Sequence, residues 1–418
     1  MNKKIEKQLK KVKRASLPMG LLSFSTRKLI LKNLAKGLRK NKKVILLANA
    51  KDLKKFRVND PMRDRLLLNN ERIEGMACEV ESLAKLPDPI GELFDCRKRH
   101  GLSMCKKRVP MGVIGIIYES RPNVTTDVTA ICLISGNTAV LKGGRDARES
   151  YIVLHKIIRQ ALLSAKADPE AIQFIDPKEK KSVLDIISAR GLVDLVIPRG
   201  SQGLINFVRE NATVPVIETG AGVCHTFVDE SAKLNPSAKI IFNAKTQRPS
   251  VCNALDTVLV HKKIAEEFLP RVAKILKEKE VEIFADRESM KILKNYYPKQ
   301  LLKNAEPSDF GREFLSQKMS VKIVSGLDEA IKHIGKYSSK HSEAILTENK
   351  TNAEKFQKEI DSAVVYVNAS TRFSDGAIFG LGSEIGNSTD KMHARGPMGA
   401  REMTTYKWII SGKYATRR

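Results

Sequence analysis

The feature of this sequence that most constrains its fold is the hydrophobic pattern after residue 108. From there on, short apolar runs alternate with stretches of helical periodicity. Alternating strands and helices of this kind predict a parallel sheet covered by helices. The expected strands are 113–118, 138–141, 172–175, 194–197 and 214–217, and the expected helices are 124–134, 148–163, 180–189 and 202–211.

A second α/β series follows residue 252, and helices precede the first one. The second series has expected strands at 257–260, 321–324, 344–347 and 363–367, with helices at 265–277 and 328–337. Before residue 90 the periodicity predicts helices over 22–38, 44–56 and 62–86. Residues 401–413 return to a strand-like alternation. A chain of 418 residues is long enough for two domains with an appendage.

The formal charge of +27 raises the hypothesis of a nucleic-acid-binding protein. However, lysines are spread along the whole sequence, only the first 14 residues form a dense basic cluster, and aromatic residues make up 6%. A lysine-rich surface that attracts anionic ligands is the better interpretation. No apolar run approaches the roughly 20 residues of a membrane span, and no signal-peptide core follows the basic N-terminus. We therefore expect neither nucleic acid nor a membrane as a partner.

The six cysteines stand at positions 78, 96, 105, 132, 224 and 252, without a CxxC pair, and the chain has no HExxH motif. This spacing predicts neither a zinc site nor a disulfide framework, and it fits a reducing cytoplasm. Cys252 differs from the others because it follows a short polar loop, with Lys245 and Arg248 nearby in sequence. Such cations favour a thiolate nucleophile. Composition alone favours the other interpretation, a small buried hydrophobic residue.

Several long segments, in one order, decide between these interpretations. They are RVPMGVIGIIYESRPNVTTDVTAICLISGNTAVLKGG (108–144), VDLVIPRGSQG (193–203), PVIETGAGVCHTFVD (215–229), NAKTQRPSVCNALDTVLVH (243–261), KHSEAILT (340–347) and the segment 368–412, which begins NASTRFSDGAIFGLGSEIGNSTDKMHARGPMG. Together they resemble the gamma-glutamyl phosphate reductases, a branch of the aldehyde dehydrogenase superfamily. Asn387 departs from the family pattern, which usually has an aliphatic residue there, and loop 219–222 varies within the family.

The resemblance implies the fold and its division into domains. It implies an α/β protein with an aldehyde dehydrogenase-like fold, made of two parallel-sheet α/β domains plus a small β oligomerisation arm. We expect an NADP-binding domain from residues 1–97 and 113–235 and a catalytic domain from residues 236–365. The expected oligomerisation arm combines 98–112 with 395–418, and 366–394 returns near the active site.

The resemblance also implies the reaction. This is the NADPH-dependent reduction of L-glutamyl 5-phosphate to L-glutamate 5-semialdehyde and phosphate, the second step of proline biosynthesis from glutamate. Cys252 would displace phosphate and carry the acyl group as a thioester. Asn123 matches the side chain that stabilises the oxyanion in related dehydrogenases, together with the backbone N–H of Cys252. Without the resemblance, Asn123 would be interpreted as a turn residue after proline.

The cofactor residues are implied in the same way. The chain has no clean GxGxxG motif, and the superfamily binds its cofactor without one. Lys142 matches a lysine that contacts the adenosine ribose, and Arg145 would pair with the 2′-phosphate of NADPH. Gly200 and Ser201 match the turn and helix start beneath the pyrophosphate. Glu313 matches the carboxylate that holds the nicotinamide ribose.

Other polar residues near these segments have weaker or different roles. Arg121, Arg372 and Arg395 are candidates for binding the anionic groups of the substrate. Glu218 stands where hydrolytic aldehyde dehydrogenases keep their general base, which a reductase does not need, so we leave it outside the catalytic set. Cys224 and His225 are adjacent in a predicted strand and therefore point to opposite faces.

Two other functions remain as alternatives. One is an NAD(P)-dependent aldehyde dehydrogenase that oxidises a small aldehyde to its acid, and the other is a basic scaffold or nucleic-acid-binding protein without catalysis. Asn123, Cys252 and Glu313 argue against the scaffold, and the RPSVCNA loop argues against the oxidising enzyme. For the reductase we expect a cytoplasmic homodimer or larger homo-oligomer, no fused kinase domain, and glutamate 5-kinase as the upstream enzyme.

Overall fold

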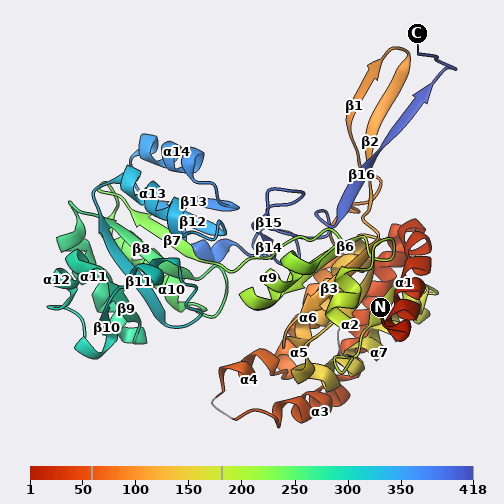
Figure 1. Ribbon diagram of the computed structural model, residues 1–418, viewed down its shortest axis with the longest axis horizontal. Coiled ribbons are helices and arrows are strands. Elements are labelled where there is room, and N and C mark those ends of the chain that lie inside the picture. Colours follow the sequence, from red (N-terminus) through yellow and green to blue (C-terminus); the bar gives the residue numbers. More distant parts are fainter. Residues whose placement is uncertain (58–59, 180–181, 418) are drawn as a thin grey trace. The chain divides into compact units, whose positions relative to one another are not determined.

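The computed structural model (Figure 1) describes residues 1–57, 60–179 and 182–417. The chain forms two compact units. Unit 1 consists of residues 1–219, 380–386 and 392–418, and unit 2 consists of residues 220–379 and 387–391. The expected α/β fold with parallel sheets is confirmed, since each unit is built around its own parallel sheet.

Unit 1 contains a four-stranded parallel sheet in the order β5-β4-β3-β6. Its strands are β3 (Val113–Tyr118), β4 (Thr138–Lys142), β5 (Ile172–Phe174) and β6 (Leu195–Arg199). Alternate residues of a strand point to opposite faces of the sheet. Accordingly, Ile114 and Ile116 join one hydrophobic cluster, whereas Val113 and Ile117 join another.

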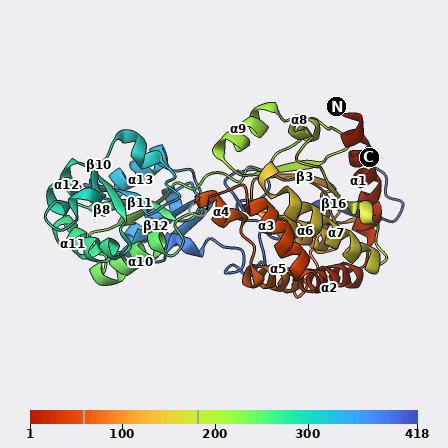
Figure 2. The same ribbon diagram turned by 90° about the horizontal axis from the view of Figure 1, so that it is seen from below.

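Helices cover both faces of this sheet (Figure 2). The cluster of Ile114 includes apolar side chains of α2 (Phe24–Lys40), α5 (Asn70–Leu83), α6 (Pro122–Ile134) and α7 (Arg148–Ser164). The opposite cluster takes its side chains from α1 (Lys3–Leu21), α8 (Ser182–Ile187) and α9 (Gln202–Asn211). The basic N-terminus is thus part of an amphipathic helix, which buries Ile5, Leu9 and Val12 and exposes its lysines.

Two elements of unit 1 differ from the sequence prediction. The helix expected over 62–86 is divided into α4 (Pro61–Leu66) and α5, because Asn69 caps the start of α5 and accepts from the backbone N–H of Arg72. The preceding helix, α3 (Lys42–Leu53), matches its prediction closely. The prediction of a strand over 214–217 is wrong, because residue 216 forms only an isolated bridge with Val196.

Unit 2 contains a seven-stranded parallel sheet in the order β10-β9-β11-β8-β7-β12-β13. The strands are β7 (Cys224–Val228), β8 (Leu255–His261), β9 (Glu282–Ala285), β10 (Leu302–Asn304), β11 (Lys318–Val324), β12 (Ser342–Leu346) and β13 (Val364–Val367). One face packs on α10 (Leu234–Thr246), α11 (Ala265–Leu276) and α12 (Arg287–Leu293). The other packs on α13 (Leu327–Tyr337) and α14 (Lys350–Glu359). Later in the chain, the short strand β14 (Asn387–Ser388) belongs to unit 2 and the short strand β15 (Gly396–Pro397) to unit 1.

A three-stranded antiparallel arm projects from unit 1 (Figure 1). It consists of β1 (Leu93–Arg99), β2 (Leu102–Pro110) and β16 (Thr404–Gly412), with β2 in the centre. A disulfide joins Cys96 of β1 to Cys105 of β2. The sequence analysis did not expect this bond, because the spacing of the cysteines does not reveal that a hairpin brings two of them together.

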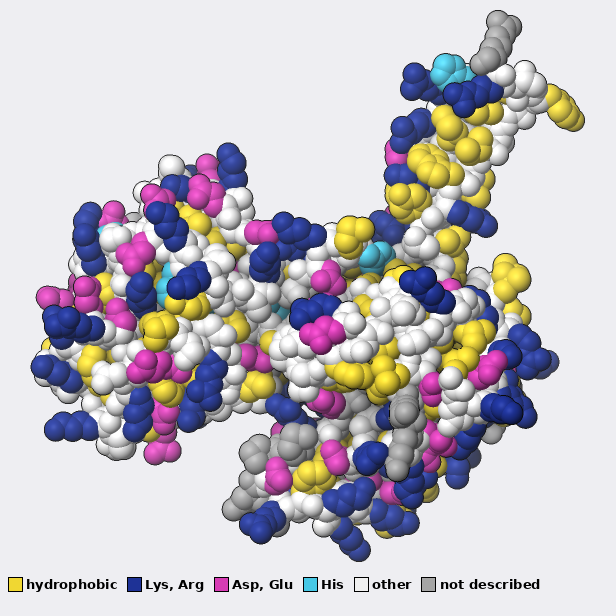
Figure 3. Space-filling view, in the orientation of Figure 1, with side chains coloured by type: hydrophobic (Ala, Val, Ile, Leu, Met, Phe, Trp, Pro, Cys, Tyr) yellow, Lys and Arg dark blue, Asp and Glu magenta, His cyan; other side chains and the backbone are white. Residues whose placement is uncertain are grey.

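The surface carries basic side chains over both units. In Figure 3 the dark blue Lys and Arg side chains are scattered, with carboxylates among them. The arm also shows apolar side chains in this view. The exposed apolar residues of β16 include Tyr406, Trp408 and Ile410. Among the described residues, no helix has the length and apolar character needed to cross a membrane.

Candidate active site

Cys252 lies half-buried in the loop between α10 and β8 of unit 2. The backbone of Gly222 approaches this loop so closely that a β-carbon there would lie 1.5 Å from the carbonyl oxygen of Cys252. The same carbonyl oxygen accepts a hydrogen bond from Cys224 Sγ at 3.3 Å. Glycine is therefore needed at position 222, and the backbone of the candidate nucleophile is held from one side.

Asn253 holds the loop from the other side. Its Nδ2 donates to the carbonyl oxygen of Ser374 at 2.9 Å, and its own carbonyl oxygen accepts from Thr371 Oγ1 at 2.8 Å. Both partners belong to the segment around a 3₁₀ helix at Thr371–Phe373. Asn387 also donates to the Ser374 carbonyl, at 3.4 Å. The departure from the family pattern at this position thus adds a buried polar contact near the loop.

Arg372, one of the cations that the sequence analysis proposed for the substrate, contacts this loop directly. Its guanidinium donates to Asn253 Oδ1 and, at 2.8 Å, to Gln247 Oε1. Burial lowers the pKa of Arg372, Arg248 lowers it further, and Cys252 raises it. Arg372 and Cys252 therefore interact electrostatically, and the positive charge favours the thiolate form of Cys252.

A buried ion pair lies behind the loop. Lys245 Nζ of α10 is 3.6 Å from Asp256 Oδ1 of β8, and both side chains are almost completely buried. Burial raises the pKa of Asp256 to about 6, although Lys245 opposes this shift. Asp256 Oδ1 also accepts from the backbone N–H of Phe314 at 3.1 Å. The sequence analysis named Lys245 only as a neighbour of the thiol, and the structure shows it paired with Asp256.

Glu313 also contacts Gly222, the residue that lies against the loop of Cys252. Its Oε1 accepts from the backbone N–H of Gly222 at 2.9 Å. The candidate ribose-binding carboxylate and the candidate nucleophile are therefore both in contact with Gly222.

The side chains of Cys224 and His225 have different partners, the Cys252 carbonyl for Cys224 and the Glu343 carboxylate for His225. Burial raises the pKa of the Cys224 thiol, so this cysteine is a poor nucleophile. His225 instead lies 3.3 Å from Glu343, with both side chains fully buried. Their different contacts agree with the prediction that the two side chains do not cooperate.

Asn123 lies in the first turn of α6 in unit 1. Its Nδ2 donates to Asp127 Oδ2 at 3.0 Å. Burial, followed by the charge of Glu79, raises the pKa of Asp127. This contact orients the amide and leaves one of its two N–H groups available to a ligand. Arg121 precedes the same helix as its N-cap residue.

Lys142 and Arg145 lie at the carboxyl end of β4 and in the turn that follows. Lys142 is mostly buried and donates to the carbonyl oxygen of Gly143 at 3.0 Å. Burial lowers its pKa, and the charge of Arg145 adds to that effect. Arg145 is exposed, and no ion pair or hydrogen bond of its side chain is found within the described ranges.

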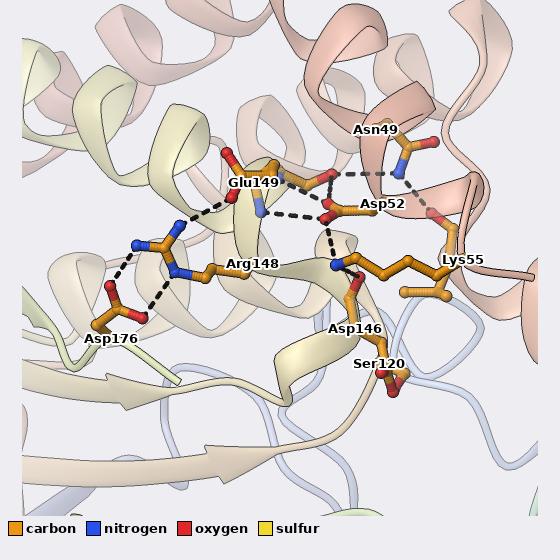
Figure 4. A network of polar contacts seen from close by, with 10 residues as sticks. Asn49, Asp52, Lys55, Ser120, Asp146, Arg148, Glu149 and Asp176 are labelled. Carbon is orange, nitrogen blue, oxygen red and sulfur yellow. Dashed lines mark hydrogen bonds and ion pairs between the residues drawn. The ribbon is translucent and has the colours of Figure 1, made fainter. Parts of the chain in front are cut away.

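A network of polar contacts supports this turn (Figure 4). The buried carboxylate of Asp52 accepts from the backbone N–H groups of Glu149 and Ser150 at the start of α7. The guanidinium of Arg148 donates to both carboxylate oxygens of Asp176, from Nε to Oδ1 at 2.8 Å and from Nη2 to Oδ2 at 2.5 Å. Because Arg148 is already paired, Arg145 is the arginine of this turn that remains for an anion.

Gly200 and Ser201 lie between β6 and α9, and Ser201 is the N-cap residue of α9. Their position agrees with the predicted turn and helix start. The carboxylate of Glu119, which follows β3, accepts from both the backbone N–H and the Oγ of Ser201, at 2.9 and 2.8 Å. The sequence analysis did not single out Glu119. The available signal was its place directly after a strand, at the sheet edge where ligands of α/β proteins bind.

The two remaining candidates also belong to unit 1. Glu218, which was left outside the catalytic set, has its carboxylate 3.7 Å from Arg209 Nη1. Arg395 is half-buried in the segment after residue 392.

Comparisons with known proteins agree with this fold. The model of the aldehyde dehydrogenase family matches residues 1–290. The gamma-glutamyl phosphate reductase of Chlorobium phaeobacteroides is 49% identical over 418 residues, which is 100% of both chains. This chain belongs to the gamma-glutamyl phosphate reductase branch of the aldehyde dehydrogenase family.

Solved structures place this member of the family among close and distant relatives. The crystal structure of gamma-glutamyl phosphate reductase from Thermotoga maritima has a TM-score of 0.94 and 46% identity, covering 99% of this chain and 100% of that chain. An acetylating aldehyde dehydrogenase from Geobacillus thermoglucosidasius has 17% identity and a TM-score of 0.72, and the match covers 99% of this chain and 98% of that chain. That second likeness concerns the fold alone.

Proposed function

We propose that this enzyme catalyses the NADPH-dependent reduction of L-glutamyl 5-phosphate to L-glutamate 5-semialdehyde and phosphate, the second step of proline biosynthesis from glutamate. The name of its relatives, at 49% identity over the full length, supports the substrate. The fold of the aldehyde dehydrogenase family supports a nicotinamide cofactor.

The observation that carries the proposal is the setting of Cys252. Cys252 is half-buried in a loop that Gly222 and Asn253 hold from two sides, and the positive charge of Arg372, which donates to Asn253, acts on the thiol and favours a thiolate. A positioned thiolate is the nucleophile that an acyl phosphate requires.

In the proposed reaction, Cys252 Sγ attacks the acyl carbon and the bond to the phosphate oxygen breaks. Phosphate leaves with the electron pair, and a thioester remains on the enzyme. Negative charge develops on the carbonyl oxygen as the thiolate adds. We propose the backbone N–H of Cys252 and Asn123 Nδ2 as its donors, and removal of one such donor typically costs about 100- to 1,000-fold in kcat.

The residues assigned to NADPH fit an anionic dinucleotide with hydroxyl-rich riboses. Arg145 offers an exposed guanidinium for the 2′-phosphate and Lys142 an ammonium for the adenosine ribose. Glu313, which accepts from the backbone N–H of Gly222, is assigned to the nicotinamide ribose. Ser201, at the start of α9, is assigned with Gly200 to the pyrophosphate. When bound, NADPH supplies the hydride that reduces the thioester.

The substrate also carries an α-carboxylate and a phosphate. We propose Arg121, Arg372 and Arg395 as the cations that bind these groups, because a guanidinium matches both anions with paired N–H donors. Arg372 also holds Asn253, so substrate binding and the loop of Cys252 would be coupled through this residue.

The reverse reaction tests the proposal. A thioester built to form from an acyl phosphate must be released by phosphate, since no assigned residue activates water. Glutamate semialdehyde and NADP should therefore give sustained turnover only in the presence of inorganic phosphate. Cys252→Ala should abolish turnover while NADPH still binds, and Cys132→Ala, which alters a buried cysteine of unit 1, serves as the control.

The opposite outcome would identify the alternative enzyme. Sustained NADP reduction at zero phosphate that is lost in Glu218→Gln would show a hydrolytic aldehyde dehydrogenase. Equal activity with several small aldehydes would also indicate an aldehyde dehydrogenase that oxidises small aldehydes.

We further propose a cytoplasmic homodimer or larger homo-oligomer, with glutamate 5-kinase supplying the substrate. Strand β16 lies at an edge of the arm and exposes Trp408, Ile409 and Ile410. An edge strand with apolar side chains is suited to pairing with another chain. Deleting residues 401–418 should therefore yield a monomer with reduced activity, measured by light scattering and turnover.

A further inference from the structure

The carboxylate of Glu119 occupies the start of helix α9 in unit 1. Tyr118 and Arg199 are paired at the ends of β3 and β6, so the residues that follow them lie side by side. The backbone N–H of Glu119 donates to the carbonyl oxygen of Arg199 at 3.0 Å. This contact places the Glu119 side chain beside Gly200 and Ser201.

The contact between Glu119 and Ser201 uses both oxygens of the carboxylate. One accepts from the backbone N–H of Ser201 at 2.9 Å and the other from Ser201 Oγ at 2.8 Å. A β-carbon at position 200 would lie 2.6 Å from Glu119 Cδ, so glycine is what allows the carboxylate to lie over the turn.

The charge of Glu119 is compensated by these donors. Within the part of the chain that the structure describes, the side chain of Glu119 has Ser201 as its partner and forms no ion pair with a Lys or Arg. A helix N-terminus stabilises a carboxylate, and α9 extends over ten residues. The same donors would stabilise a phosphate group.

A carboxylate and a phosphate cannot both accept from one backbone N–H and one hydroxyl, and their like charges repel each other. We propose that Glu119 is a built-in competitor for the cofactor, whose carboxylate must leave Ser201 before the pyrophosphate of the dinucleotide binds there. This inference rests on the proposed function and adds a residue that sets cofactor affinity. Only the fraction of molecules in which Glu119 has left Ser201 can bind the pyrophosphate. The apparent affinity for the dinucleotide is therefore reduced by that fraction.

The consequence for turnover follows from the same competition. The carboxylate that returns to Ser201 takes the donors from the departing dinucleotide and so favours release of the oxidised cofactor. Removal of its charge should tighten dinucleotide binding and slow release. A residue that merely supported the turn would have the opposite effect, because its loss would disorder the binding site.

The test measures binding of two ligands to the full-length enzyme by titration calorimetry. Glu119→Gln keeps the shape of the side chain and removes its charge, and we expect the Kd for NADPH to fall by about 5- to 10-fold, the scale of a lost charge-assisted contact. The Kd for adenosine 2′-phosphate, which carries no pyrophosphate, should not change. Glu6→Gln, on α1 of the same unit, controls for a general loss of negative charge.

Each outcome decides the proposal. Unchanged or weaker NADPH binding in a folded Glu119→Gln enzyme would overturn it, as would equal tightening of both ligands or the same tightening in Glu6→Gln. If Glu119→Gln does not fold, Glu119→Asp, whose carboxylate is retracted from Ser201, should show tighter NADPH binding, and the absence of that effect would overturn the proposal. Failure of the wild-type enzyme to bind NADPH would instead refute the proposed function, and this inference with it.

Discussion

Gly222 and Cys252 are in backbone contact, and a β-carbon on Gly222 would lie 2.8 Å from Cys252 Cα as well as 1.5 Å from its carbonyl oxygen. Neither atom belongs to a flexible side chain, so a methyl group at position 222 must displace the loop that carries the thiol. The reactivity of Cys252 therefore depends on a residue distant in sequence and without a side chain.

Gly222→Ala should lower kcat/KM by about 100-fold or more, because a displacement of about 1 Å at the reacting atoms has effects of that size. Steady-state kinetics and thermal unfolding should be measured together. Gly335→Ala in α13 is the matched control, since a β-carbon there meets no atom within 4 Å. Unaltered kinetics in Gly222→Ala would contradict the assigned site.

Arg145→Glu should shift cofactor preference from NADPH toward NADH by about 1–3 kcal/mol, on the scale of hydrogen bonds to charged groups. The exposed Arg145 is assigned to the 2′-phosphate, which NADH lacks. The ratio of kcat/KM for the two cofactors measures the shift. Lys156→Glu, an equal charge change at an exposed position of α7, should leave the ratio nearly constant. A wild-type enzyme that uses both cofactors equally would disprove this role.

Asp52→Ala should destabilise unit 1 by about 2–3 kcal/mol, because it leaves buried donors at the start of α7 without their acceptor. Asp52→Asn keeps one acceptor oxygen and should be less destabilised. Urea unfolding followed by circular dichroism gives both values. Asp168→Ala, which removes an exposed cap, should cost less than Asp52→Ala. Equal costs would show that burial of Asp52 has no energetic importance.

Stability should decrease between pH 6.5 and pH 4.5, and His333 should contribute to this decrease. Burial, followed by the charges of His225 and Lys322, lowers the pKa of His333 from 6.5 to about 3. In this window the unfolded chain binds a proton that the folded protein excludes, so protonation favours unfolding as the pH falls. The contribution is fully present above pH 6.5 and lost as the pH falls toward 3.

His333→Phe keeps a ring against Phe310 and Tyr337 and removes the titrating group. Its unfolding free energy should depend less on pH, by at most about 1.4 kcal/mol per pH unit. Urea titrations of both proteins at pH 7.0, 5.5 and 4.5 measure the difference. Parallel pH profiles would show that His333 does not take part.

Much of the fold could be predicted from the pattern of apolar residues. Ile114 and Ile116 are buried on one face of β3 and Val113 and Ile117 on the other, so the strand is apolar throughout, as a doubly covered parallel strand must be. The run 214–217 is also apolar but pairs through a single bridge. Local hydrophobicity specifies burial, whereas a strand also needs a neighbour at hydrogen-bonding distance.

The sequence by itself determined the candidate residues for the site. Cys252, Arg145 and Ser201 were proposed because the segments that contain them resemble those of the gamma-glutamyl phosphate reductases, and a resemblance of this kind can be seen in the chain alone. Only the tertiary structure decided what surrounds them. Glu119 lies on Ser201, 82 positions away in sequence, and the hairpin of the arm joins Cys96 to Cys105. Such pairings depend on which strands become neighbours in a sheet, and that is a property of the packed molecule rather than of any local segment.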